Sequence, residues 1–250
     1  SVAFMIAFLF MLILGKPFIA WLKKKKYGDT AREEGPKSHF DKSGTPTMGG
    51  LLIIGAILFA TAIAGNFTNK FIVFLFVITI LFTTIGFYDD YLKLTKHKKG
   101  LSGKKKILGQ LIITALTFGF VYKFGLVSKT IDFSIINPLI KNSYLYITPI
   151  LFFIFVAFVI IGSSNAVNLT DGLDGLVSGP TIVVSITLLI ITYLTGNVKY
   201  AKYLNLYYVP QAAEMIVYLA SVIGALIGFL WYNFYPAQVF MGDTGSLTLG

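Results

Sequence analysis

Acidic side chains at the ends of apolar segments are the residues of this sequence best suited to catalysis. Five of the eleven Asp and Glu residues lie there: Asp89, Asp90, Asp171, Asp174 and Asp243. Charges at membrane depth are costly and usually functional. The sequence has no Cys, and His39 and His97 stand far apart in polar stretches. Because hard oxygen ligands without His or Cys select Mg²⁺ or Mn²⁺ over zinc, the carboxylates indicate a magnesium-type site.

The Asp89-Asp90 pair could simply end a helix at the water interface, but negative charge at a helix C-terminus opposes the macrodipole. Adjacent helical residues point in different directions, so the two Asp are expected to have different roles. Mutual repulsion should also raise the proton affinity of one of them.

Two turns add further polar groups. In Asn165–Leu176, Asp171 and Asp174 share a face if the segment is helical, although a plain loop is also possible. In Gly242-Asp243-Thr244-Gly245-Ser246, glycines flank Asp-Thr and would let backbone N–H groups approach an anion. This string also matches an aspartic protease motif, but that chemistry needs a second carboxylate that shares one proton, and no second Asp-Thr-Gly occurs.

The segment Lys42–Gly50 (Lys-Ser-Gly-Thr-Pro-Thr-Met-Gly-Gly) is either a linker or a phosphate-binding turn at a helix N-terminus, and it lacks the spacing of a Walker-A loop. Lysines within 93–106 could neutralise a diphosphate. Mg²⁺ is typically held by one or two carboxylates plus substrate phosphates. Together these features predict metal-assisted phosphoryl transfer onto a membrane-held acceptor.

The elements that position these residues are predicted to be membrane-spanning helices. Of 250 residues, 56% are hydrophobic and 13% charged, and the mean hydropathy is +0.77. This composition excludes an ordinary soluble domain and disorder, and it disfavours a nucleic-acid binder despite the net charge of +10. We predict an all-α polytopic membrane protein, a single domain over 1–250, with these spans: 2–22, 49–66, 71–88, 107–126, 147–166, 176–195 and 213–232. An eighth span would begin near 246.

Positive charge predicts the orientation. The loops 23–48 and 89–106 each hold seven Lys and Arg residues, whereas the three loops on the other side hold six together. The basic loops are therefore expected to be cytoplasmic. The acidic residues named above fall on the same side, and the outer segment 127–146 could form a short hairpin.

Taken in order, the strings resemble a known family. Gly35–His39, Lys42–Gly50, Asp89-Asp90, Asn168–Leu176 and Gly242–Ser246 match the bacterial phospho-N-acetylmuramoyl-pentapeptide transferases. The resemblance implies transfer from UDP-MurNAc-pentapeptide to undecaprenyl phosphate, which gives lipid I and UMP with Mg²⁺ at the cytoplasmic face of the plasma membrane. It also implies a homodimer of ten-span subunits in the lipid bilayer.

The resemblance carries over to individual residues. Asp89 is similar to the family's proposed base, Asp90 would assist it or line the metal site, and Asp243 is similar to the main Mg²⁺ ligand. Lys105 resembles a phosphate-binding lysine. Substrate contacts are expected from the following: Lys42, Thr47, Lys105, Asn168, Asp171, Asp174, Asn233 and Phe240.

Two alternatives stay open. Another polyprenyl-phosphate sugar-1-phosphate transferase, of the GlcNAc type, would share the acidic pairs. A transporter is a weaker alternative, because transporters place ionisable groups near the bilayer midplane. The family also has a His-rich loop further along its sequence than the segment matched by 1–250. We therefore expect the sequence to be a piece of a longer protein and residues 1–250 alone to be inactive, which an assay in membranes with both substrates would check.

Overall fold

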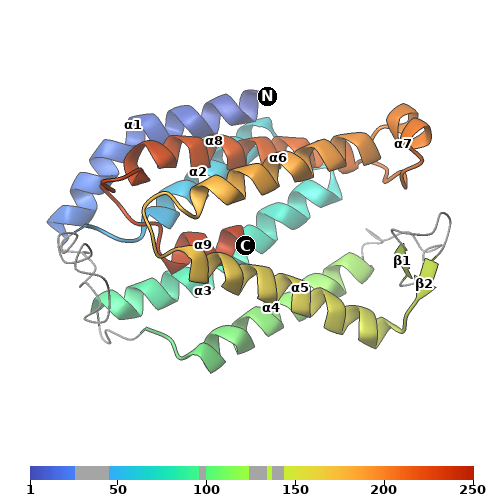
Figure 1. The fold of residues 1–250 in the computed structure, drawn as a ribbon, viewed down its shortest axis with the longest axis horizontal. Helices are drawn as coiled ribbons and strands as arrows, with labels where there is room; N and C mark the ends of the chain where they lie inside the picture. Colours follow the sequence, from blue (N-terminus) through green and yellow to red (C-terminus); the bar gives the residue numbers. More distant parts are fainter. Residues whose placement is uncertain (26–44, 96–99, 124–133, 137–143) are drawn as a thin grey trace.

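The computed structural model shows a bundle of helices that run mostly along one direction (Figure 1). It describes all residues except 26–44, 96–99, 124–133 and 137–143. The long helices are α1 Val2–Lys24, α2 Gly49–Ala64, α3 Lys70–Thr95, α4 Gly103–Lys123, α5 Pro149–Thr170, α6 Ser178–Thr195 and α8 Met215–Asn233. The short elements are α7 Val198–Leu204, the 3₁₀ turn η2 Ala212–Glu214, α9 Asp243–Leu249, and the strands β1 Ser134–Ile136 and β2 Tyr144–Tyr146.

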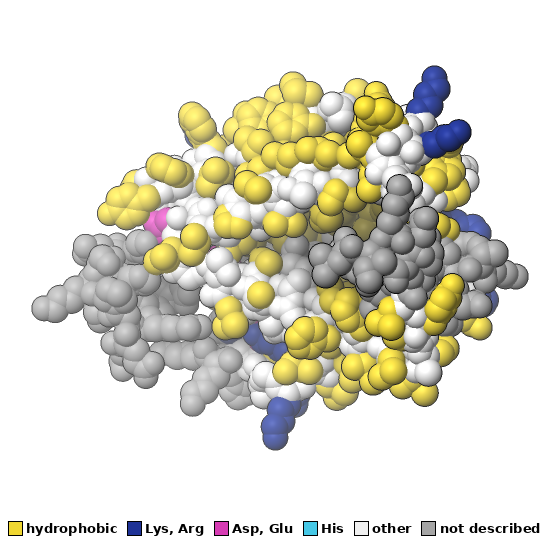
Figure 2. All heavy atoms as spheres, turned by 45° about the vertical axis from the view of Figure 1, so that its right-hand side comes forward, with side chains coloured by type: hydrophobic (Ala, Val, Ile, Leu, Met, Phe, Trp, Pro, Cys, Tyr) yellow, Lys and Arg dark blue, Asp and Glu magenta, His cyan; other side chains and the backbone are white. Residues whose placement is uncertain are grey.

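Six of the described helices are long and apolar enough to cross a membrane, and α2 is a shorter apolar helix of 16 residues. All seven predicted spans therefore correspond to helices, which confirms a polytopic all-α membrane protein. Figure 2 shows hydrophobic side chains over much of one face, with Lys and Arg mainly at its margins. Large side chains such as Phe158, which is 77% exposed, suit contact with lipid.

The structure differs from the prediction at the ends of several helices. We expected the third span to close at the acidic pair, but α3 continues to Thr95. Asp89 and Asp90 are thus inside a helix and not at its C-terminus. Likewise, Asp243 is the first residue of α9 and not part of a turn. The predicted hairpin is present: β1 pairs antiparallel with β2, with Ile135 opposite Leu145.

The bundle has two groups of helices. Helix α8 packs on α1, α2 and α6, and its buried Phe229 and Leu226 meet Met11 and Ile53 in one core cluster. Helices α3, α4 and α5 form the second group (Figure 1). The short helix α9 contacts α2, α3 and α5. Helix α9 therefore lies between the two groups, and its side chains can contact helices of both.

Candidate active site

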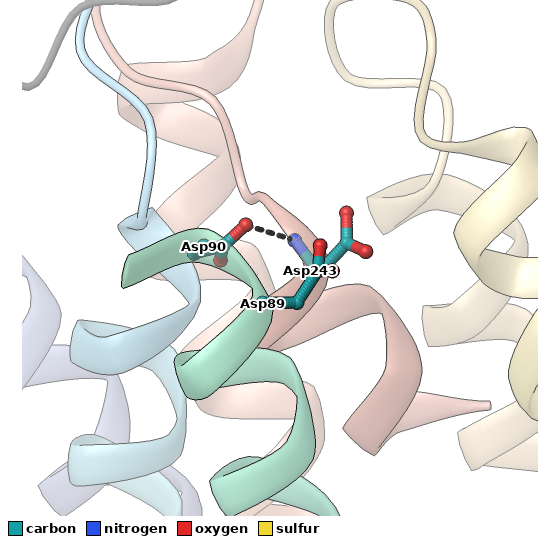
Figure 3. Close-up of side chains that lie close together, drawn as sticks. All are labelled: Asp89, Asp90 and Asp243. Atoms are coloured by element: carbon teal, nitrogen blue, oxygen red, sulfur yellow. Dashed lines mark hydrogen bonds between the residues drawn. The ribbon is translucent and has the colours of Figure 1, made fainter. Parts of the chain in front are cut away.

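Three carboxylates from two helices meet at one place. Asp89 and Asp90 come from α3 and Asp243 begins α9 (Figure 3). One oxygen from each carboxylate lies within 4.8 Å of one from each of the others, which is close enough for a single metal ion to contact all three. Asp89 is fully buried and Asp90 is 2% exposed. Burial of this much like charge requires compensating cations.

Two lysines provide that compensation. Lys93 Nζ lies 2.7 Å from Asp89 Oδ2 and donates to Asp243 Oδ1 at 2.7 Å. Lys106 Nζ lies 3.1 Å from Asp89 Oδ2 and donates to Asp243 Oδ2. Asp89 Oδ1 also accepts a hydrogen bond from the Leu101 N–H at 2.6 Å. Asp89 and Asp243 are therefore held against cationic groups from both sides.

Helical periodicity explains why these residues meet. On α3, the buried residues Thr79, Phe82, Gly86 and Asp90 recur every three or four positions, and Lys93 follows at the same spacing. On α4, the buried residues Gln110, Ile113, Thr114 and Thr117 continue the face that Lys106 begins. Both lysines thus lie on the inward faces of their helices.

Lys105 does not lie on that face. Its side chain is exposed, because adjacent residues of a helix point about 100° apart. The family resemblance indicates Lys105, and the residues alone indicate only the lysines within 93–106. The sequence therefore does not single out Lys93 and Lys106 as site residues. The 106, 110, 113, 114, 117 pattern on α4 would have identified Lys106.

This difference gives a test with a matched pair of variants. Lys106→Gln should lower kcat/KM by about tenfold or more, because it removes charge-assisted hydrogen bonds at the carboxylates. Lys105→Gln, on the adjacent position of the same helix, should have a smaller effect. Steady-state kinetics on the full-length enzyme would measure both, and a larger loss in Lys105→Gln would contradict the assignment of Lys106.

Asp90 has a different environment from Asp89. Its Oδ1 accepts a hydrogen bond from the Asp243 N–H at 3.1 Å, and its Oδ2 accepts from the Thr244 N–H at 2.8 Å and the Thr244 hydroxyl at 2.6 Å. The two adjacent acids thus have different hydrogen-bond partners, and that they have different roles stays a prediction. Figure 3 shows Asp90 directed to the beginning of α9.

The glycine-rich segments fix α9 against α2 and α3. A Cβ at Gly86 would lie 2.3 Å from the Asp243 carbonyl oxygen, and a Cβ at Gly50 would lie 2.1 Å from the Gly245 nitrogen. Only glycine permits such close approach of two backbones. The distance between the acidic pair and Asp243 therefore depends on these two glycines.

A second prediction follows from Gly86. Gly86→Ala should force α9 away from α3 and destabilise the protein by about 1–3 kcal/mol, with loss of activity. Gly119→Ala on α4, where an added Cβ meets nothing within 4 Å, is the matched control. Thermal unfolding and turnover of the two variants would be compared. Equal unfolding midpoints would contradict the role of this contact.

The segment Pro46–Gly50 pairs through backbone hydrogen bonds with the residues before α9. The Phe240 N–H donates to the Pro46 carbonyl, and the N–H groups of Gly49 and Gly50 donate to the carbonyls of Phe240 and Met241, all at 2.8 Å. The N–H groups of Gly49 and Gly50 are therefore used by the backbone before α9. Binding of phosphate by other N–H and hydroxyl groups of Lys42–Gly50 stays a prediction. Lys42 lies outside the described residues.

The Asn and Asp residues of the other turn also contact this region. Asn168 Nδ2 donates to Ser246 Oγ of α9 at 2.8 Å. Asp174 Oδ2 accepts from the Ala237 N–H at 3.1 Å. Asn233 Oδ1 accepts from the Gly175 N–H at 3.0 Å, and its Nδ2 donates to the Val239 carbonyl at 2.9 Å. These contacts join the turn after α5 to the segment before α9.

Asp171 is half-buried at the C-terminal cap of α5. Burial, together with the nearby Asp243 carboxylate, raises the pKa of the Asp171 side chain to about 7.

The donor set fits a hard divalent cation. It consists of carboxylate oxygens only, and Lys93 and Lys106 already place positive charge between Asp89 and Asp243. Mg²⁺ suits oxygen ligands of this type together with phosphate oxygens. Carboxylates and ammonium groups in this arrangement can bind a metal ion together with a phosphate ester.

Comparisons with known proteins identify the family of the chain. Residues 71–250 match the model of glycosyl transferase family 4, and residues 42–54 match phospho-N-acetylmuramoyl-pentapeptide-transferase signature 1. A phospho-N-acetylmuramoyl-pentapeptide-transferase from Fusobacterium nucleatum is 49% identical over 99% of this chain and 68% of its own length.

Two further relatives bear the same name. The protein from Thermodesulfovibrio yellowstonii is 43% identical over 99% of this chain and 68% of its own length. The one from Francisella tularensis is 44% identical over 97% of this chain and 67% of its own length. The chain therefore belongs to the phospho-N-acetylmuramoyl-pentapeptide-transferase family, within glycosyl transferase family 4.

Proposed function

We propose that the protein transfers phospho-MurNAc-pentapeptide from UDP-MurNAc-pentapeptide to undecaprenyl phosphate, in the membrane stage of peptidoglycan synthesis. The observation that carries this proposal is the meeting of Asp89, Asp90 and Asp243 in a chain that is 49% identical to a relative of that name. An oxygen of the lipid phosphate bonds to the phosphorus that bears the sugar. The bond from that phosphorus to the bridging oxygen breaks, and UMP leaves with the electron pair.

The carboxylates have separate roles in this proposal. Asp89, which is buried and fixed by the Leu101 N–H, takes the proton of the lipid phosphate. Asp243 would hold Mg²⁺, and Asp90 lies beside it. When bound, Mg²⁺ neutralises charge on the diphosphate. Lys93 and Lys106 stand beside the same carboxylates and supply further positive charge where the phosphates would lie.

The remaining predicted residues are proposed to bind the nucleotide sugar. Asp171 and Asn168 lie next to α9, and Thr47 and Phe240 belong to the paired segments before it. Asn233 and Asp174 hydrogen-bond to backbone N–H groups of the neighbouring segments. We therefore propose that they help substrate binding by fixing the conformation of the turn. Lys42 stays a predicted substrate contact, and Lys105 stays a predicted phosphate contact.

The location of the site follows from the same proposal. We infer that the acidic cluster faces the cytoplasm of a bacterial plasma membrane, because the two most basic loops flank it in sequence. We also propose a homodimer, as the family resemblance implies.

The test is a reconstitution of the full-length enzyme with both substrates. We expect UMP release only when undecaprenyl phosphate is present, and a strong preference for UDP-MurNAc-pentapeptide over UDP-GlcNAc. Preference for UDP-GlcNAc would favour the GlcNAc-type alternative. Movement of the nucleotide sugar across the vesicle membrane without UMP release would favour a transporter.

A further inference from the structure

Helix α9 has no side-chain cap of its own. Its N-cap residue is Gly242, whose φ is +74°, and glycine offers no oxygen to the free N–H groups of the first turn. A side chain there would have no space, because a Cβ at Gly242 would lie 2.8 Å from Asp90 Oδ2 and 2.9 Å from Thr47 Oγ1. The cap must therefore come from another element.

Asp90 supplies that cap from α3. Its carboxylate accepts the N–H groups of Asp243 and Thr244 and the Thr244 hydroxyl, which are three of the roughly four hydrogen bonds that a carboxylate can accept. A negative charge at this place also favours the positive end of the helix. Among the residues that the structure describes, its nearest ammonium group is Lys93 Nζ at 3.8 Å, whereas Lys93 Nζ lies 2.7 Å from Asp89 and from Asp243.

Asp243 has the opposite arrangement. Its backbone N–H is bound by Asp90, while both oxygens of its side chain accept from ammonium groups of Lys93 and Lys106. One contact fixes the main chain of Asp243 and leaves its carboxylate directed at cations. Asp90 thus binds the backbone of Asp243, and the side chain of Asp243 binds the two lysines.

We propose that Asp90 is a positioning residue, which caps α9 from outside and thereby orients the Asp243 carboxylate, and that it is not itself a ligand of the cation. This refines the proposed function, on which it rests for the identity of the reaction. It also replaces the sequence-based assignment of Asp90 as a residue that lines the metal site.

The experiment compares Asp90→Asn with Thr244→Val in the full-length enzyme. Asp90→Asn places an NH₂ group opposite an N–H group of α9. Thr244→Val keeps the size of Thr but removes the hydroxyl that donates a hydrogen bond to Asp90. Thr248→Val, one turn further along α9, controls for loss of a hydroxyl in this helix. Asp243→Asn serves as the reference for loss of a cation ligand.

The first readout is thermal unfolding in a chelator. Loss of a cap should lower the unfolding midpoint of Asp90→Asn and Thr244→Val by about 2–4 °C, and by more than in Thr248→Val. The double variant Asp90→Asn/Thr244→Val should be as stable as the less stable of the two single variants, because both changes break the same contact. If Asp90 were instead a cation ligand, the chelator would leave it among unneutralised carboxylates. Removal of its charge would then relieve repulsion, and the unfolding midpoint would stay the same or rise. That result for Asp90→Asn would overturn the proposal.

The second readout is Mn²⁺ binding, followed by the electron paramagnetic resonance signal of the free ion. We expect Asp90→Asn and Thr244→Val to raise the Kd by roughly three- to tenfold and to agree within about threefold. A larger excess in Asp90→Asn would overturn the proposal. Unchanged Mn²⁺ binding in Asp243→Asn would instead count against the metal assignment of the proposed function, and the unfolding comparison would still decide the role of Asp90.

Discussion

Asp243→Asn in the full-length enzyme is expected to lower kcat by about 10²–10³-fold or more, because a metal-assisted step is worth several kcal/mol. The Asn side chain keeps the size of Asp but loses the charge that faces Lys93 and Lys106. The proposed Mg²⁺ site would lose its main anionic ligand. Turnover should therefore fall and should require more Mg²⁺.

The measurement is a series of initial rates over Mg²⁺ concentration in reconstituted enzyme. Glu214→Gln is a suitable control, since Glu214 lies in η2 at the start of α8, whereas the acidic cluster lies near the end of α3. It should behave as the unchanged enzyme. Near-normal turnover of Asp243→Asn with the same Mg²⁺ dependence would show that another group holds the cation.

The second large effect is expected from Asp89→Asn. The buried Asp89 is proposed to accept a proton from the lipid phosphate, and loss of a general base typically costs about 10²–10⁴-fold in rate. Asn can still accept the Leu101 N–H, so the local fold should be kept. We therefore expect a fall in kcat with a small change in KM.

Separate titrations of the nucleotide and lipid substrates would give both constants for this variant. A rise in KM alone would mean that Asp89 binds substrate and takes no proton. Together with Asp243→Asn, this variant separates proton transfer from cation binding, because only Asp243→Asn should change the Mg²⁺ dependence.

The sequence predicts the helices well because hydropathy dominates their formation. Each predicted apolar span corresponds to a helix, and the boundaries fail where polar residues continue an inward face. Hydropathy predicts that the third span ends at 88, whereas α3 runs to Thr95. Asp89 contacts Lys106 of α4, and Asp90 and Lys93 contact Thr244 and Asp243 of α9. The partners that stabilise this polar end are distant in sequence.

The contacts of the site are harder to foresee for the same reason. Asn233 and Asp174 bond to backbone groups of a neighbouring segment, and neither hydrogen bond leaves a pattern in the sequence. The start of α4 was placed at 107, whereas the helix begins at Gly103. Lys105 and Lys106 therefore lie outside the predicted span, and the inward direction of Lys106 follows only when the spacing of Gln110, Ile113, Thr114 and Thr117 is extended back into that first turn.

The position of α9 in the chain also has a consequence for biosynthesis. Asp243 leaves the ribosome long after Asp90, since 153 positions separate the two residues. During that interval a nascent chain holds Asp89 and Asp90 together with Lys93 and Lys106, which gives two carboxylates and two ammonium groups. These four charges balance formally, so the net negative charge of the complete cluster is added last, with α9.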